Sequence, residues 1–242
     1  MSGPKVLVLG ATGPAGICLL RELLSRNHAT VVYARNPTKI PEDILSNPLL
    51  ETVKGEMEDH DALSSAMAKC TIILSLLGPD IKDKDIKPSM YADIYKSSVF
   101  PLMRQHGIKR IFASSTITTQ RPEDHWTLIQ TVIVWFVWLF ANPVYRNVIN
   151  LAKVFDNDAS DLEWTVFRVA QIPGESDETS WKVDREEGEV FSGWVGEKWW
   201  TSSVKRSALA RWIVDQVESE ENKWVRKMPA VALLSGSEKK SV

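Results

Sequence analysis

The sequence predicts an α/β fold in which a doubly wound parallel sheet is covered by helices on both faces. Short apolar runs of strand length alternate with helical patterns over the first two thirds of the chain, the order expected when parallel strands are joined by helices. A glycine-rich turn ends the first of these runs. The length of 242 residues is enough for one large domain with a full hydrophobic core.

The expected strands and helices follow from two hydrophobic periods. Short apolar runs bounded by turn residues predict strands at 5–10, 30–34, 50–54, 71–76, 110–113 and 163–168. Apolar residues that repeat every three to four positions predict helices at about 14–26, 61–68, 89–106, 144–154 and 207–217. No internal repeat interrupts this order, so we expect a single domain over residues 1–242.

The turn after the first strand is the most informative motif. The sequence KVLVLGATGPAG places Gly10, Gly13 and Gly16 between a Val/Leu strand and an amphipathic helix that begins near Pro14. Glycine permits a tight turn and leaves bare backbone where a pyrophosphate must come close, and the helix N-terminus presents N–H groups to that anion. The spacing is a variant of the dinucleotide fingerprint, and the strand–turn–helix context supports a Rossmann-type fold.

The end of the second expected strand indicates which nucleotide is bound. An NAD site usually has an Asp or Glu here that bonds the ribose 2′-hydroxyl, whereas this chain has Arg35 followed by Asn36, with Lys39 nearby. A guanidinium suits a 2′-phosphate, so we expect NADP(H) rather than NAD(H). The alternative is that Arg35 is only a solvated loop charge.

Composition narrows the partners and the compartment. A net charge of −2 without a long Lys/Arg run gives no basic face for nucleic acid. Cys18 and Cys70 lie in apolar contexts, which favours buried, reduced thiols. The chain enters its first strand almost at once, so we expect no signal peptide and a cytoplasmic location. No His/Cys/Asp cluster has metal-ligand spacing, and no metal is expected.

The segment 128–141 stands apart because 132–141 is apolar at every position. It is too short to span a bilayer. Three interpretations remain open: a helix buried in the core or a subunit interface, a wall of an apolar substrate pocket, or a segment in weak contact with a membrane surface. They overlap, because a helix after the fifth strand lies beside the crevice at the sheet's carboxyl edge. The oligomeric state, monomer or homodimer, stays open with them.

Motifs spread over about residues 4–220 resemble the atypical short-chain dehydrogenase/reductase group that includes NmrA-like and biliverdin-reductase-B-like proteins. The matching stretches are VLVLGATGPAG, VVYARNPTKIP, ILSLLGP, HGIKRIFASST, DLEWTVFRVAQIPG and SSVKRSALARWIVDQVE. The apolar segment resembles fungal members most. The resemblance implies a Rossmann-type fold that binds NADP(H), in a family of reductases, redox-sensing regulators and tailoring enzymes of fungal secondary metabolism.

The resemblance also implies positions for the cofactor. The glycine turn would hold the pyrophosphate, Arg35 and Asn36 the 2′-phosphate end, and Glu56 and Met57 the adenine. The remaining positions lie along the cofactor from the glycine turn to the nicotinamide: Gly10, Thr12, Gly13, Pro14, Ala15, Gly16, Leu76, Leu77, Gly78, Ser114, Ser115, Val169, Ala170 and Gln171.

The usual Tyr-x-x-x-Lys proton relay of short-chain dehydrogenases is missing. The residues four positions after Tyr91, Tyr95 and Tyr145 are Tyr, Val and Ile, so none pairs with a lysine at helical spacing. Four groups remain as catalytic candidates. They are Tyr145, Lys153, Ser115 (with Thr116), and His125 oriented by Asp124. Each also has a purely structural alternative: Tyr145 as a core aromatic, Lys153 as a surface lysine, Ser115 as a cap at the strand end, and His125 as an exposed residue without a catalytic role.

We expect residues 1–170 to form the cofactor-binding core, 171–234 a small substrate-binding portion, and 235–242 a flexible tail. The connection 171–200 is long and rich in tryptophan, as lids and binding loops are. Trp181, Trp194, Trp199 and Trp200 suit a flat apolar ligand, or else they fill a satellite core.

The expected function is therefore an NADP(H)-dependent oxidoreductase acting on a hydrophobic, aromatic or polycyclic small molecule, with a role in secondary-metabolite biosynthesis. Two alternatives stay open. One is a non-redox cyclase, isomerase or dehydratase on the same fold, which the missing relay favours. The other is a regulator that senses NADP without turnover.

Overall fold

The computed structural model describes residues 5–80, 85–221 and 223–237, and over these it has an eight-stranded sheet. The strand order is β3-β2-β1-β4-β5-β6-β8-β7, with every neighbouring pair parallel except β7 and β8. The strands are β1 (Val6–Leu9), β2 (Thr30–Ala34), β3 (Leu50–Lys54), β4 (Ile72–Ser75), β5 (Arg110–Thr116), β6 (Glu163–Val169), β7 (Val190–Gly193) and β8 (Ala230–Leu233).

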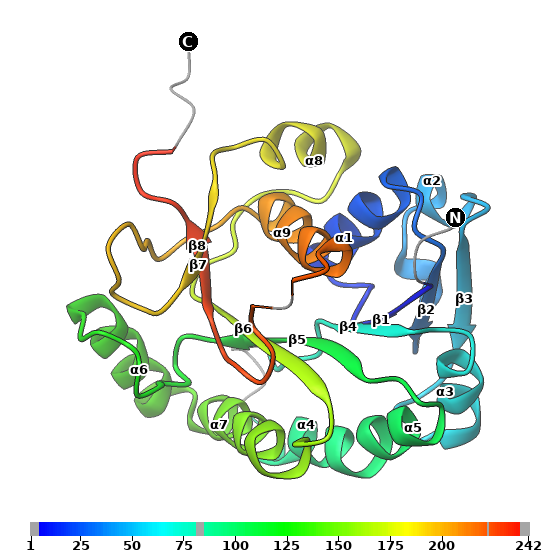
Figure 1. Cartoon of the computed structure of the whole chain (residues 1–242), viewed down its shortest axis with the longest axis horizontal. Coiled ribbons are helices and arrows are strands. Elements are labelled where there is room, and N and C mark those ends of the chain that lie inside the picture. Colours follow the sequence, from blue (N-terminus) through cyan, green and yellow to red (C-terminus); the bar gives the residue numbers. More distant parts are fainter. Residues whose placement is uncertain (1–4, 81–84, 222, 238–242) are drawn as a thin grey trace.

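Helices cover both faces of this sheet, as Figure 1 shows. One face carries α1 (Pro14–Ser25), α2 (Glu42–Leu45), α8 (Glu178–Asp184) and α9 (Arg206–Glu218). The other carries α3 (His60–Met67), α4 (Met90–Ile94), a π-helical turn (Tyr95–Val99), α5 (Phe100–Gln105) and α7 (Asn142–Asp158). A short 3₁₀ turn (Pro37–Lys39) follows β2, and α6 (Leu128–Phe140) lies at one end of the sheet. The doubly wound fold class is confirmed.

Most of the predicted elements lie where expected, and the differences are local. The helix predicted at 89–106 is one rod in which a π turn joins α4 to α5. The connection predicted over 171–200 contains α8 and β7, and β8 was not predicted. These late elements escape prediction because α8 and β7 are short and sit among charged residues and tryptophans, without a clean apolar period.

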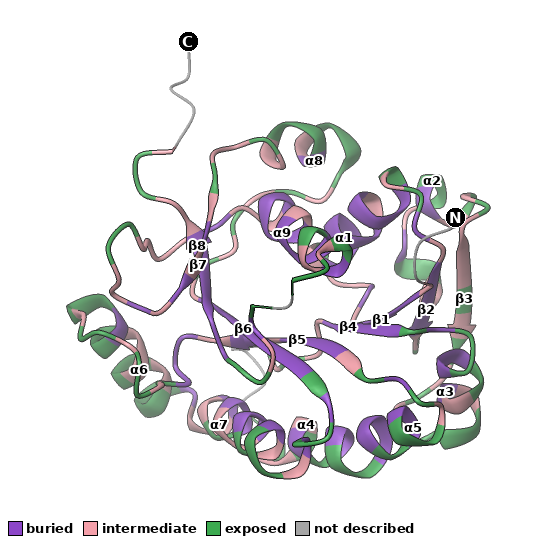
Figure 2. Cartoon of the chain, viewed as in Figure 1, coloured by how far each residue is buried: buried purple, intermediate pink, exposed green. Residues whose placement is uncertain are grey.

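Two hydrophobic cores hold the sheet between its helical layers. α1 and α9 pack against one face around Leu19, Leu20 and Ile213, while α3, α5 and α7 pack against the other around Phe100 and Phe155. Figure 2 shows the buried residues concentrated on the strands and on the inward faces of these helices. Both cysteines are buried, as expected. Burial raises the pKa of the Cys18 thiol, and it raises that of Cys70 to about 11.

Helix α6 lies at the surface and not in the core. The expectation that segment 128–141 is buried in the core is therefore wrong, while the subunit-interface alternative stays open. Of its residues only Gln130 is buried, while Leu128, Trp135 and Phe140 are at least half exposed. Figure 2 shows the outer side of α6 as largely exposed at the edge of the molecule. The helix is apolar on nearly every side because it carries no charged residue.

Across the described residues, no single helix combines the length and the apolar character needed to cross a bilayer. Taken together, α6 and α7 have that length and composition, but the chain bends by 117° between them.

The first residues expected in the flexible tail, 235–237, make hydrogen bonds to the C-terminal portion. Ser235 donates its backbone N–H to the carbonyl of Trp199, and the Ser237 hydroxyl donates to the carbonyl of Leu234. These contacts hold 235–237 in a turn against the C-terminal portion. The remainder of the predicted tail, 238–242, lies outside the described residues.

Candidate functional site

The glycine turn between β1 and α1 is built for close approach. Gly10 has φ +79°, and a Cβ there would lie 2.8 Å from the Leu76 carbonyl carbon. A Cβ on Gly16 would lie 2.5 Å from the Gly10 carbonyl oxygen, so both positions require glycine to close the turn. Gly13 is the N-cap residue of α1, and a Cβ there would make only an ordinary contact, 3.9 Å from the Gly10 carbonyl oxygen. The turn therefore exposes bare backbone at a helix N-terminus, which is what a diphosphate needs.

A polar cavity of about 500 Å³ extends from this turn along the carboxyl ends of β1, β2 and β3. Its lining includes the positions expected for the adenosine end of the cofactor, Arg35, Asn36, Glu56 and Met57, together with Lys39. It continues to residues expected nearer the pyrophosphate and the nicotinamide: Gly10, Thr12, Leu76, Leu77 and Gly78. Two features of this lining fit a phosphorylated nucleotide. Arg35 and Lys39 supply positive charge near the end of β2, and the glycine turn beside them presents backbone N–H groups.

The Arg35 side chain is 77% exposed, and its Nε lies 3.8 Å from Glu56 Oε2. Such a weak, solvated contact leaves the guanidinium available to another anion. The Tyr33 hydroxyl supports the opposite wall by donating to the Glu56 carbonyl at 2.6 Å. Burial, with nearby Asp59, Glu56 and Glu58, raises the pKa of Tyr33 to about 12, so this phenol stays neutral and acts as a fixed donor.

An apolar cavity of about 580 Å³ adjoins the polar one, and the two share Leu76, Leu77, Gly78 and Tyr91. It lies at the carboxyl ends of β4, β5 and β6, at the sheet edge where ligands of open α/β folds bind. Helix α6 supplies one wall, and the start of α7 another. The wall residues from these two helices are Val132, Ile133, Phe136, Val137, Val144, Asn147, Val148 and Leu151.

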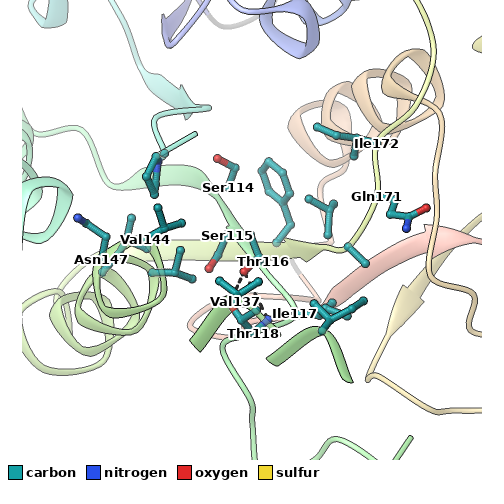
Figure 3. Close-up of a pocket in the computed structure, with 18 of the residues that line it drawn as sticks. Ser114, Ser115, Thr116, Ile117, Thr118, Val137, Val144, Asn147, Gln171 and Ile172 are labelled. Carbon is teal, nitrogen blue, oxygen red and sulfur yellow. Dashed lines mark hydrogen bonds between the residues drawn. The ribbon is translucent and has the colours of Figure 1, made fainter. Parts of the chain in front are cut away.

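Hydroxyl groups at the end of β5 form the polar floor of this apolar cavity. Figure 3 shows Ser114, Ser115 and Thr116 at the centre, with Asn147 on one side and Gln171 on the other. The Ser115 hydroxyl lies 3.3 Å from that of Thr119, and the Thr116 hydroxyl lies 2.5 Å from that of Thr118. A mostly apolar chamber with a few convergent polar groups is the usual form of a small-molecule site.

The structure brings together only part of the expected site. Val169, Ala170, Gln171, Ser114 and Ser115 line the apolar cavity together with Ala15. Among the catalytic candidates only Ser115 and its neighbour Thr116 do so. Tyr145, Lys153 and His125 line neither cavity: Tyr145 is half-buried, while Lys153 and His125 are exposed.

Asp124 does not orient His125, which corrects the acid–base pairing expected from their adjacency. Both oxygens of Asp124 accept from the guanidinium of Arg168, at 2.6 and 2.7 Å, and Arg168 is fully buried. Asp124 also accepts the backbone N–H groups of Arg121 and Val195. Burial raises the pKa of the Asp124 carboxyl, but the ion pair and the other bonds outweigh it and hold the pKa below its usual range.

Two residues at the apolar cavity were missed by the search for a Tyr-x-x-x-Lys pair. Tyr91 lines both cavities from the start of α4, and Asn147 lines the apolar one from α7. Asn147 is fully buried; its Oδ1 accepts the backbone N–H of Tyr91 at 3.1 Å and its Nδ2 donates to the carbonyl of Lys87 at 2.6 Å. A buried amide on α7 thus fixes the segment that presents a tyrosine to the cavity. Asn147 is the single polar residue on the apolar face of α7, and this position could have marked it as a site residue in the sequence.

The tryptophans of the C-terminal portion pack rather than line a site. Trp194 meets Trp224 edge to face with ring centres 5.8 Å apart, Trp181 is buried beside Arg185, and Trp200 packs against a small cluster around Ile117, Val195 and Ala230. None of these residues, nor exposed Trp199, lines either cavity. Trp181 and Trp194 pack in the core on the α1 and α9 side, and of the four tryptophans only Trp200 packs in a small satellite cluster.

Among the described residues, no group of three or more His, Cys, Asp or Glu side chains is arranged to hold a metal ion.

The chain matches a family model over residues 10–220, which is described as NAD(P)H-binding. It belongs to this NAD(P)H-binding family. The matched range includes every residue that lines the two cavities.

Solved structures share the whole fold at low sequence identity. A short-chain dehydrogenase/reductase from Veillonella parvula in complex with NADP is 17% identical, covers 98% of this chain and 97% of its own, and superposes with a TM-score of 0.70. A Rossmann-fold NAD(P)-binding family protein from Shigella flexneri is 19% identical, with coverage of 99% and 98% and a TM-score of 0.64. These similarities establish the fold.

Curated relatives match only a short segment. Isoeugenol synthase 1 of Clarkia breweri is 29% identical over 80 residues, which is 30% of this chain and 25% of the relative. A protein of Arabidopsis thaliana named a probable pinoresinol-lariciresinol reductase 3 is 32% identical over 74 residues, 30% of this chain and 24% of that protein. The chain therefore matches about a quarter of the length of these relatives.

Proposed function

We propose that this protein is an NADPH-dependent oxidoreductase that acts on a hydrophobic, aromatic or polycyclic small molecule. The observation that carries the proposal is the junction of the two cavities. A polar chamber with a glycine turn and exposed cations opens, at Leu76–Gly78 and Tyr91, into an apolar chamber of about 580 Å³. An extended ligand with a charged end and a reactive end fits this pair of chambers, and a second, apolar ligand fits beside its reactive end.

In this proposal the residues of the polar chamber set the choice of nucleotide. The turn at Gly13 and the N-terminus of α1 would hold the diphosphate, and Arg35, Asn36 and Lys39 would hold a 2′-phosphate. No carboxylate ends β2, where an NAD site would need one to bond the ribose hydroxyls. The structurally similar short-chain dehydrogenase/reductase from Veillonella parvula is in complex with NADP, which supports the choice of NADP(H).

The bound cofactor would supply a hydride, and the chain's own residues would orient the acceptor and exclude water. The walls from α6 and α7 desolvate the reacting groups, which strengthens every polar contact at the floor of the cavity. A substrate carbonyl oxygen placed at the end of β5 would meet the hydroxyls of Ser114 and Ser115, and Tyr91 lines the same chamber. These hydroxyls are the proposed hydrogen-bond donors to the developing oxyanion.

The curated relatives agree with the proposed substrate class. Both are named for aromatic plant compounds, and one is named as a reductase. With an apolar cavity of matching character, this supports a place for the protein in secondary-metabolite biosynthesis.

A second candidate is non-redox chemistry on the same scaffold, such as cyclisation or dehydration. It is favoured by one observation: Tyr145 and Lys153, on the helix that carries the usual relay, both lie outside the cavities. The two candidates separate in one experiment, in which the protein is incubated with NADPH and aromatic polyketide-like and terpenoid-like ketones. Nicotinamide absorbance and product are followed together. Loss of absorbance with product supports reduction, and product without cofactor consumption supports the second candidate.

A further inference from the structure

The outer side of α6 carries an apolar surface that the fold leaves uncovered. Its members are the large apolar side chains that are 42–78% exposed on α6 and just before it: Trp126, Leu128, Ile129, Val132, Trp135, Phe136, Trp138, Leu139 and Phe140. Figures 1 and 2 show α6 at an end of the sheet, with its outer side exposed. We refer to these nine residues as the α6 surface.

The size of the α6 surface exceeds what a lone protein exposes. Aromatic side chains have about 150–250 Å² each to bury, and aliphatic ones less, so these nine at roughly half exposure present roughly 800–900 Å² of apolar area. The largest apolar patch on an ordinary monomer is about 300–600 Å². A stable protein–protein interface buries about 800 Å² per partner. The α6 surface alone is therefore large enough for one side of such an interface.

We propose that a second copy of this chain covers the α6 surface, so that the protein is a homodimer in which the two α6 helices pack across a two-fold axis. No Asp, Glu, Lys, Arg or His occurs from Trp126 to Tyr145, so two copies of this surface meet without like charges facing each other. Aromatic residues with few charges are typical of the centre of a homodimer interface. A self-complementary patch of this kind is what a two-fold contact requires.

Charge argues against a bilayer as the occupant. Helices that lie on membrane surfaces carry Lys and Arg along a polar face, and these cations supply part of the binding. Helix α6 carries none, and the nearest basic residues along the chain are Arg121, which pairs with Asp156, and Arg146.

The dimer would complete the substrate cavity of the proposed function. Val132 and Phe136, which are about half exposed, line the apolar chamber from α6. Packing by the partner helix would hold this wall in place and exclude water from its outer side. The proposal needs only the α6 surface, and it stands or falls independently of whether NADPH is the cofactor.

Sedimentation velocity over roughly 0.5–100 µM protein tests the proposal, because interfaces of this size have dissociation constants from micromolar downwards. We expect the wild type to sediment at twice the monomer mass of 27.3 kDa. Trp135→Glu with Trp138→Glu removes two aromatic contacts that lie outside both cavities, and we expect self-association to weaken at least about 30-fold, as for hot-spot tryptophans. Val183→Glu, at a residue 67% exposed on α8, is the matched control and leaves the dimer unchanged.

A second measurement does not depend on weakening the contact. Both native cysteines are buried, so mild oxidation of Trp135→Cys reports the new thiol alone and forms a covalent dimer, whereas Val183→Cys does not. A wild type that stays monomeric at 100 µM overturns the proposal, and flotation of that monomer with phosphatidylcholine vesicles would assign the surface to a bilayer instead. A dimer that survives both glutamates also overturns it. Far-UV circular dichroism of each variant shows that the fold is intact.

Discussion

Arg35 is the residue on which the choice between NADPH and NADH depends, and its replacement by alanine measures that choice. The guanidinium is 77% exposed, and its nearest anion, the Glu56 carboxylate, is 3.8 Å away. Hydrogen bonds between charged groups contribute about 1.5–3 kcal/mol. Solvent screening at so exposed a site places Arg35 at the lower end, which corresponds to a roughly tenfold increase in the NADPH dissociation constant. NADH, which has no 2′-phosphate, is expected to bind Arg35→Ala about as well as the wild type.

Isothermal titration of each variant with both cofactors provides the measurement. Arg146→Ala is the matched control, because Arg146 is exposed on α7 and lines neither cavity. Glu56→Gln removes the carboxylate beside Arg35 and is expected to tighten NADPH binding about twofold to threefold, as for an exposed charge pair. If Arg35→Ala weakens both cofactors equally, or weakens neither, the guanidinium does not read the 2′-phosphate and the reasoning is refuted.

Three further predictions concern the turn, the buried ion pair and the cavity. Gly10→Ala places a Cβ against the Leu76 backbone at φ +79° and is expected to lower the free energy of unfolding in urea by about 2–4 kcal/mol; Gly78→Ala, with no atom within 4 Å of its added Cβ, should change it little. Asp124→Asn leaves the Arg168 charge buried without its carboxylate and is expected to cost about 3–5 kcal/mol. The folded state lowers the pKa of Asp124, so the wild type loses the stability of the Asp124–Arg168 pair as pH falls below about 4 towards the folded pKa. Asp124→Asn lacks that acid-dependent loss, and parallel acid-unfolding curves for the two proteins would contradict this role of the pair. Val137→Trp fills part of the apolar cavity and is expected to abolish binding of an aromatic ketone, measured by tryptophan quenching, with NADPH affinity largely retained because the polar cavity holds the phosphates; unchanged ketone binding would contradict the placement of the substrate.

The first half of the fold was predictable because local pattern and tertiary role coincide there. The strand–turn–helix around Gly10 and Gly13 needs only nearby residues to be recognised, and its geometry follows from glycine's lack of a Cβ. The exposure of α6 could not be predicted in the same way, because an apolar helix has the same sequence pattern whether it is buried or lies at the surface. Whether Trp135 is covered depends on elements far away in the sequence.

The site was predictable where backbone defines it and not where side chains converge from distant segments. Leu76 and Ser115 follow from their positions at strand ends, at the carboxyl edge of a parallel sheet. Tyr91 and Asn147 meet at the cavity from α4 and α7, 56 residues apart, and no local spacing marks that encounter. Adjacency in the sequence suggests that Asp124 pairs with His125, whereas in the structure it pairs with Arg168, 44 residues further along the chain.

Strand β8 lies between β6 and β7 although it is the last strand in the chain, and this order has a consequence for how the protein is made. The guanidinium of Arg168 donates Nε–H to the carbonyl of Met228, and its backbone N–H donates to that of Pro229. While the ribosome is still adding the final residues, β6 is already synthesised but its interior charge lacks these acceptors, and β7 has no strand to pair with. This half of the sheet therefore closes only after β8 has been synthesised. A nonsense mutation as late as codon 225 would leave Arg168 paired with Asp124 but without its acceptors on Met228 and Pro229, and it would leave β6 and β7 with unpaired edges that cellular quality control can recognise.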